Sequence, residues 1–302
     1  MVSIEHHGHK INHTLPRREF LKQGAAGTVA VVSVSLAVWQ ILNSSEHGEK
    51  ATLVEKMMKD FPDDLKGAEL VLKHWEPESE TAVVVLLCPH DDYRDNRESL
   101  PPLGQAVEKT QENAVEMLND LESRAPHCVP AIAYAEGIPQ GSNETARREE
   151  LKEIPSSPKM AEWQKQQRAM TQLIYGPLFE RWISGALEIQ GVEDSALHAS
   201  VARVEPLRYD SAYQDEYYRL QRERSIHILN VAAASNNGLV LLQIGPYPHG
   251  KNIMEELAMR RGKFGTKALS YAVLIPSGTT DVVVEEEKMQ SSVIEEQYSS
   301  HK

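Results

Sequence analysis

Histidine and acidic side chains follow the apolar runs of this sequence at the points where buried strands would end. The run TAVVVLLCPH ends at His90, and the run NGLVLLQIGPYPH ends at His249. Between them, VPAIAYAEG carries Glu136 near its end, and ALEIQGVED closes on Glu193 and Asp194. Imidazole and carboxylate groups that meet in one place can act as a general base, a general acid or metal ligands. The spacing therefore predicts a functional site where these strand ends meet.

The elements that must position these side chains follow from the hydropathy pattern. The apolar run 81–90 is too continuous for a half-exposed strand and predicts a buried, parallel one. Further buried strands are predicted at 129–137 and 237–249, a short third strand at 186–194 and a last strand at 268–276. Helical patterns lie between or beside them, at 103–123, 159–182, 206–236 and 250–262. The order predicts an α/β protein, a single domain with a mostly parallel central sheet flanked by helices.

Ligands bind at the carboxyl ends of strands in open parallel sheets, so the strand-end residues are expected to share one rim. Asp91 and Asp92 follow His90 directly and belong to the same group. A single histidine at such a position could equally cap a helix or bind a loop carbonyl. Two histidines and several acids at one rim favour the functional interpretation.

Three further segments have less regular patterns. Residues 51–75 are expected to be helical, with an interruption at Pro62. The polar, proline-containing segment 138–158 predicts a surface loop that could serve as a lid over the site. The acidic residues 277–302 predict a disordered or loosely attached tail.

Composition excludes several classes of protein. The chain has 302 residues and a formal charge of −12, which argues against nucleic acid or anionic lipid as the main partner. It has only 2 cysteines, too few for a disulfide scaffold or a cysteine-rich zinc module. Cys88 lies inside a predicted strand and Cys128 just before another. Both are expected to be buried small residues rather than nucleophiles or a disulfide pair.

The N-terminal residues resemble a twin-arginine export signal. Arg17 and Arg18 are followed by Phe-Leu-Lys and then by the uncharged run 24–42. An ordinary membrane anchor is the alternative, and either places the body outside the cytoplasm, in the periplasm or on the outer face of the membrane. We expect a signal or anchor over 1–48, a domain over 49–276 and the tail beyond it. The expected partners are the export machinery and, if the run stays uncleaved, the membrane through 24–42 alone.

Two local motifs are poor matches to known sites. GPYPHGKN has the spacing of a phosphate-binding loop, but Pro246 and Pro248 lack the backbone N–H donors that such a loop needs. PHDD after the first strand resembles the zinc-dependent LmbE-like deacetylases. There, however, the proline follows the histidine, whereas Pro89 precedes His90 in this chain.

The order of strand ends over about residues 80–276 resembles the TraB/Tiki, ChaN and erythromycin-esterase superfamily. A strand ending in histidine, a strand ending Glu-Gly, a strand ending Gly-Val-Glu-Asp and a late strand with a Gly-x-x-x-His ending carry the resemblance, together with an arginine-rich helix. It implies that His90, Glu136, His249 and Arg224 are catalytic. Asp91, Asp92, Glu193 and Asp194 are then expected to bind the substrate.

The resemblance leaves two functions open. The first is an exported hydrolase of an ester or amide bond in a small molecule or peptide. A divalent metal (Zn, Mn or Co) held by His90, Glu136 and His249 would assist it in the metal-dependent members. The second is a non-catalytic haem- or metal-binding protein of the ChaN type, which would use the same rim.

Overall fold

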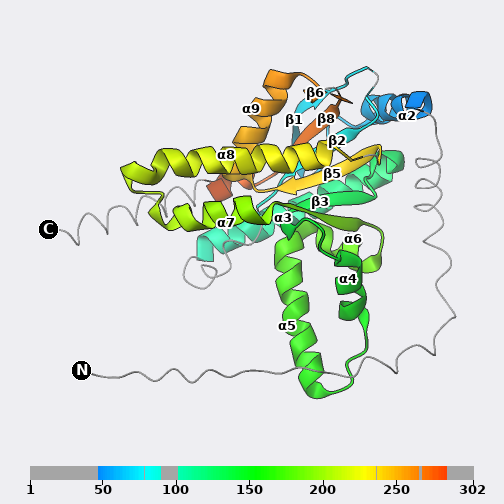
Figure 1. The fold of residues 1–302 in the computed structure, drawn as a ribbon. Helices are drawn as coiled ribbons and strands as arrows, with labels where there is room; N and C mark the ends of the chain where they lie inside the picture. Colours follow the sequence, from blue (N-terminus) through cyan, green and yellow to red (C-terminus); the bar gives the residue numbers. More distant parts are fainter. Residues whose placement is uncertain (1–46, 78, 90–100, 236, 265–266, 284–302) are drawn as a thin grey trace.

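A mixed six-stranded sheet covered by helices on both faces forms the body of the protein (Figure 1). The structure is a computed structural model and describes residues 47–283 except 78, 90–100, 236 and 265–266. It confirms the α/β class and the helices flanking the sheet. No helix among these described residues is long and apolar enough to cross a membrane.

The strands run in the order β1-β8-β2-β5-β3-β4. Their bounds are β1 Ala68–His74, β2 Ala82–Leu87, β3 Ile132–Pro139, β4 Glu188–Glu193, β5 Leu239–Ile244 and β8 Ser270–Pro276. The five strands from β8 to β4 are parallel, and only β1 is antiparallel, to β8. A separate two-stranded ribbon pairs β6 (Lys263–Phe264) with β7 (Lys267–Ala268). All five predicted strands are present, and their parallel arrangement is confirmed.

The helices divide between the two faces of the sheet. Their bounds are α2 His47–Asp60, α3 Pro101–Arg124, α4 Glu144–Lys152, α5 Pro158–Tyr175, α6 Phe179–Ser184, α7 Ser195–Val204, α8 Ser211–Ala233 and α9 Lys251–Arg260. On one face of the sheet, buried side chains of α2, α3 and α6 form a hydrophobic core with the strands. Those of α8 and α9 share a second core with the other face. Apolar burial on both faces explains why the strand sequences are continuously apolar.

The prediction of a helix throughout 51–75 is wrong in its second half. Residues Ala68–His74 form β1, whose register with β8 shifts between Leu70 and Leu72. This register shift interrupts the alternation of apolar and polar residues by which an edge strand is recognised in a sequence. Pairing with β8, rather than the residue pattern of the segment itself, makes it a strand.

The predicted loop 138–158 contains a helix, α4, so that prediction also needs correction. Asn143 begins the helix by accepting a hydrogen bond from the N–H of Ala146. The predicted helix 159–182 is broken where Gly176 takes a φ of +47°, and α6 follows in a new direction. Helices α4 and α5 project together away from the sheet (Figure 1).

The structure describes only the first residues of the predicted tail, up to Val283. Thr279 and Val282 are buried, so the chain still packs on the body beyond Pro276. Residues 284–302 and the predicted signal or anchor lie outside the described residues.

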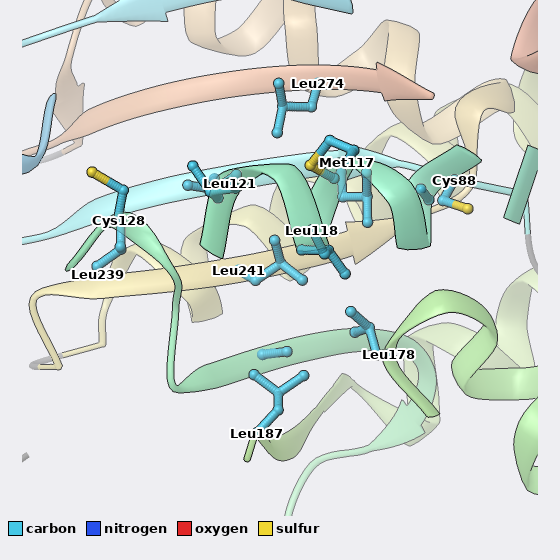
Figure 2. Close-up of a cluster of buried hydrophobic side chains, with 14 of the residues drawn as sticks. Cys88, Met117, Leu118, Leu121, Cys128, Leu178, Leu187, Leu239, Leu241 and Leu274 are labelled. Carbon is cyan, nitrogen blue, oxygen red and sulfur yellow. The ribbon is translucent and has the colours of Figure 1, made fainter. Parts of the chain in front are cut away.

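Both cysteines are buried and unpaired, as predicted. Figure 2 places Cys88 and Cys128 at opposite ends of the cluster in which Met117, Leu118 and Leu121 of α3 pack on the sheet. Burial raises the pKa of the Cys128 thiol to about 11, and it raises the pKa of Cys88 further still. Thiols in this state carry almost no reactive thiolate at neutral pH.

We therefore expect both cysteines to resist alkylation in the folded protein. Iodoacetamide at pH 7.5 should modify them on the order of 100-fold more slowly than in the same chain unfolded in guanidinium. Mass spectrometry of timed samples measures both rates. Rapid modification of either cysteine in the native protein would contradict the packing described here.

Candidate functional site

Two glutamates from neighbouring strands begin the site at the carboxyl edge of the sheet. Glu136 lies in β3, and Glu193 is the last residue of β4. A backbone N–H reaches each carboxylate: Gly245 donates to Glu136 Oε2 at 2.8 Å, and Gly137 donates to Glu193 Oε1 at 3.0 Å. These bonds fix the orientation of both carboxylates before any side chain of the helices contributes.

Two glycines make the close approach of β3 and β4 possible. Gly137 has a φ of +81°, a conformation that favours glycine, and it interrupts the regular pairing of the two strands. A Cβ on Gly191 would lie 1.9 Å from the carbonyl oxygen of Pro139. The bend in β3 beyond Glu136 therefore depends on the absence of side chains at both positions.

Arg224 of α8 lies between the two glutamates. Its Nε and Nη2 donate to Glu193 Oε2 and Oε1 at 3.0 and 2.5 Å, which is a bidentate pair. The same Nη2 lies 3.0 Å from Glu136 Oε1. One guanidinium thus joins β3, β4 and α8.

His249 completes the group from the turn that follows β5. This short helical turn spans Pro246–Gly250 and leads directly into α9. The imidazole Nε2 lies 3.0 Å from Glu136 Oε1 and 3.1 Å from Arg224 Nη1. The imidazole Nδ1 lies 2.8 Å from Ser225 Oγ. Ser225 in turn contacts Asn252 of α9, whose Nδ2 donates to Ser225 Oγ at 3.1 Å.

The whole group is shielded from water. Glu136, Glu193 and His249 are 3–4% exposed, and Arg224 is 8% exposed. Charges in such a place interact strongly and must be balanced, because burying an uncompensated charge is costly. Arg224 balances one of the two carboxylates.

The structure brings together four of the eight predicted site residues: Glu136, Glu193, Arg224 and His249. These four side chains meet at the carboxyl edge of the sheet, on the side that α8 covers. Asp194 has a different task, because its Oδ1 accepts the N–H groups of Ala196 and Leu197 and caps α7. The predicted residues His90, Asp91 and Asp92 lie outside the described residues.

Three residues of the site were not predicted from the sequence. Ser225 and Asn252 contact each other and lie beside His249, and the half-exposed His198 of α7 has its Nδ1 4.0 Å from Glu193 Oε2. One signal could have identified Ser225. Residues 221, 224 and 225 continue, at helical spacing, the core-facing stripe of 228, 229 and 232. Polar residues on a buried stripe indicate a site rather than a solvated helix face.

Two of the three predicted metal ligands, Glu136 and His249, are among the described residues, and their surroundings do not favour a metal ion or an axial bond to haem. A divalent cation bound by Glu136 and His249 would meet the fixed positive charge of Arg224, which lies within 3.1 Å of both. Among the described residues, no three His, Cys, Asp or Glu side chains are grouped so that they could hold a metal ion. Both nitrogens of His249 already have partners.

Comparisons of the chain with protein-family models, with curated proteins and with solved structures found no match. The fold and the site define an α/β protein with a buried Glu-Arg-Glu-His group at the carboxyl edge of its sheet. The resemblance to the TraB/Tiki, ChaN and erythromycin-esterase superfamily stays a prediction.

Replacing Arg224 by methionine should destabilise the fold by about 3–5 kcal/mol, because two buried carboxylates lose their shared cation. Adding Glu193→Gln to Arg224→Met should restore part of this loss, since one of the uncompensated charges is then removed. Urea unfolding followed by circular dichroism measures both changes.

The matched control is Arg222→Met on the same helix. Arg222 is 38% exposed and pairs with Glu255 at the surface and, at 3.4 Å, with the buried Glu256. Because Glu256 keeps Arg260 as a closer partner, the removal of Arg222 should cost about 1 kcal/mol, well below the cost at Arg224. Equal losses for Arg222→Met and Arg224→Met would show that the buried group has no special role in stability.

Proposed function

We propose that the protein is a hydrolase of ester or amide bonds that uses Glu136 and His249 as a proton-exchanging pair. The observation that carries the proposal is the 3.0 Å contact between Glu136 Oε1 and His249 Nε2 inside a buried site. A carboxylate and an imidazole in this arrangement can remove a proton from water and return it to a leaving group. Such a pair at the carboxyl edge of a parallel sheet lies where ligands bind in this class of fold.

The proposed reaction keeps its protons in balance. Glu136 accepts a proton from a water molecule as the water oxygen adds to the carbonyl carbon of the substrate. The proton passes to His249 Nε2, across the contact already described. When the carbon–oxygen or carbon–nitrogen bond to the leaving group breaks, the imidazolium gives that proton to the departing atom. The products are a carboxylic acid and an alcohol or an amine.

Arg224 supports this chemistry by its charge. Because it contacts Glu136 and His249 together, its positive charge balances the negative charge that moves from the carboxylate of Glu136 to the carbonyl oxygen of the substrate. Glu193 holds the guanidinium in place by the bidentate pair. Arg224 is therefore oriented before the substrate arrives, which is what electrostatic catalysis needs.

The setting of the reaction follows from the N-terminal sequence. The twin-arginine-like residues 17–22 and the uncharged run 24–42 support a place outside the cytoplasm, reached through the export machinery. The substrate there would be a small molecule or a peptide that contains an ester or amide bond. A haem or metal carrier is the weaker candidate, because the partners of His249 leave it poorly suited as an axial ligand.

The test is a comparison of the wild type with Glu136→Gln on a panel of esters and amides of increasing size. Glutamine keeps the shape of the side chain and its contact with the Gly245 N–H, but it cannot accept the proton. The variant should lose on the order of 10²–10⁴ in kcat for the substrates that the wild type hydrolyses.

Glu256→Gln is the matched control, because Glu256 is a buried glutamate of α9 that pairs with Arg260 and Arg222, neither of which belongs to the site. Its activity should stay within about twofold of the wild type. Absence of hydrolysis by the wild type on the whole panel, or full activity of Glu136→Gln, would overturn the proposal.

A further inference from the structure

We infer that Ser225 and Asn252 are positioning residues that hold His249 with a proton on Nδ1, so that Nε2 is the atom that exchanges a proton with Glu136. The inference about the tautomer stands on hydrogen bonds alone. Its meaning for catalysis rests on the proposed function. Which nitrogen of a histidine is protonated is set by the hydrogen bond that the other nitrogen makes.

The hydroxyl of Ser225 has one hydrogen to donate and two lone pairs that accept. Its hydrogen is directed at the backbone oxygen of Gln221, 2.7 Å away in the preceding turn of α8. Asn252 Nδ2 donates to Ser225 Oγ at 3.1 Å and occupies one lone pair. The remaining lone pair faces His249 Nδ1 at 2.8 Å. With its own hydrogen already used, Ser225 can only accept there, so Nδ1 must carry the proton.

The other side of the ring is compatible with this tautomer but does not fix it alone, because Nε2 faces both a donor, Arg224 Nη1, and an acceptor, Glu136 Oε1. Arg224 Nη1 lies 3.1 Å from His249 Nε2 in hydrogen-bond geometry, and a guanidinium has donors only. A proton on Nε2 of the neutral ring would place donor against donor. The unprotonated Nε2 accepts from Arg224 and lies beside Glu136 Oε1 at 3.0 Å.

With Nδ1 protonated, the Glu136–His249 contact can take up one proton and share it between the two side chains. Two acceptor atoms, Oε1 and Nε2, face each other across 3.0 Å. A proton taken up by either atom lies between them and can move to the other. Asn252 and Ser225 do not touch the reacting atoms in this account. They act through the ring of His249, as the partner of a catalytic histidine does in hydrolases that orient the imidazole from behind.

Nitrogen NMR of the full chain tests the tautomer directly. A long-range proton–nitrogen correlation spectrum distinguishes a protonated from an unprotonated ring nitrogen, and the His249→Gln variant assigns the signals. At a pH where the ring is neutral, we expect Nδ1 to be protonated in the wild type. Ser225→Ala should shift the population towards protonated Nε2, and Ser225→Thr should restore the wild-type pattern, because threonine in a helix keeps a hydroxyl near the same carbonyl.

Kinetics give the second readout. If the hydrolase proposal holds, Ser225→Ala should lower kcat by about tenfold or more with little change in KM, and Ser225→Thr should recover most of it. A wild-type ring protonated on Nε2 would overturn the inference and leave the hydrolase proposal standing. A ring protonated on Nδ1 in a protein without hydrolytic activity would support the inference and contradict the proposed function.

Discussion

The guanidinium of Arg224, buried between two carboxylates, is the interaction on which the rest of the site depends. Glu136 and Glu193 lie on neighbouring strands and would repel each other if both were ionised without a cation between them. Arg224 lies within 3.0 Å of each, and it reaches them from α8 on the covering face. The ion pairs therefore fix the position of α8 along the sheet edge as well as the charge of the site.

The other groups of the site are arranged around this cation. Gly245 immediately precedes the turn that carries His249, and its N–H donates to Glu136. The segment that follows β5 is therefore hydrogen-bonded to Glu136 by its backbone as well as in contact with it through His249. Ser225 follows Arg224 in α8 and meets the other side of the imidazole ring. The histidine is thus held on both nitrogens by residues that are adjacent in one helix. A small shift of α8 would change both contacts at once, which couples the stability of the fold to the geometry of the pair.

The sequence predicted the parts of the fold that depend on local apolar pattern. Strands β2, β3, β5 and β8 are recognisable because burial on both faces leaves long apolar runs. Strand β1 was missed because pairing with β8, and not its own pattern, makes it a strand. Of the site, Glu136 and His249 could be found because each follows a buried run.

Other features of the site depend on contacts between distant parts of the chain. Asp194 and Glu193 are adjacent in sequence, yet one caps α7 and the other binds Arg224. Their different roles depend only on the directions in which the two side chains point at the end of β4. The role of Asn252 likewise cannot be predicted from the sequence, because it depends on a contact with Ser225 that joins α9 to α8.

The central claim is that Glu136 and His249 act as one unit in moving a proton. A double-mutant cycle on kcat tests it most directly, with Glu136→Gln, His249→Gln and the two combined. The account predicts that each single variant loses nearly as much activity as the double variant, because either change removes the same proton path. Losses that multiply, so that the double variant equals the product of the singles, would show that the two residues act independently and would contradict the account.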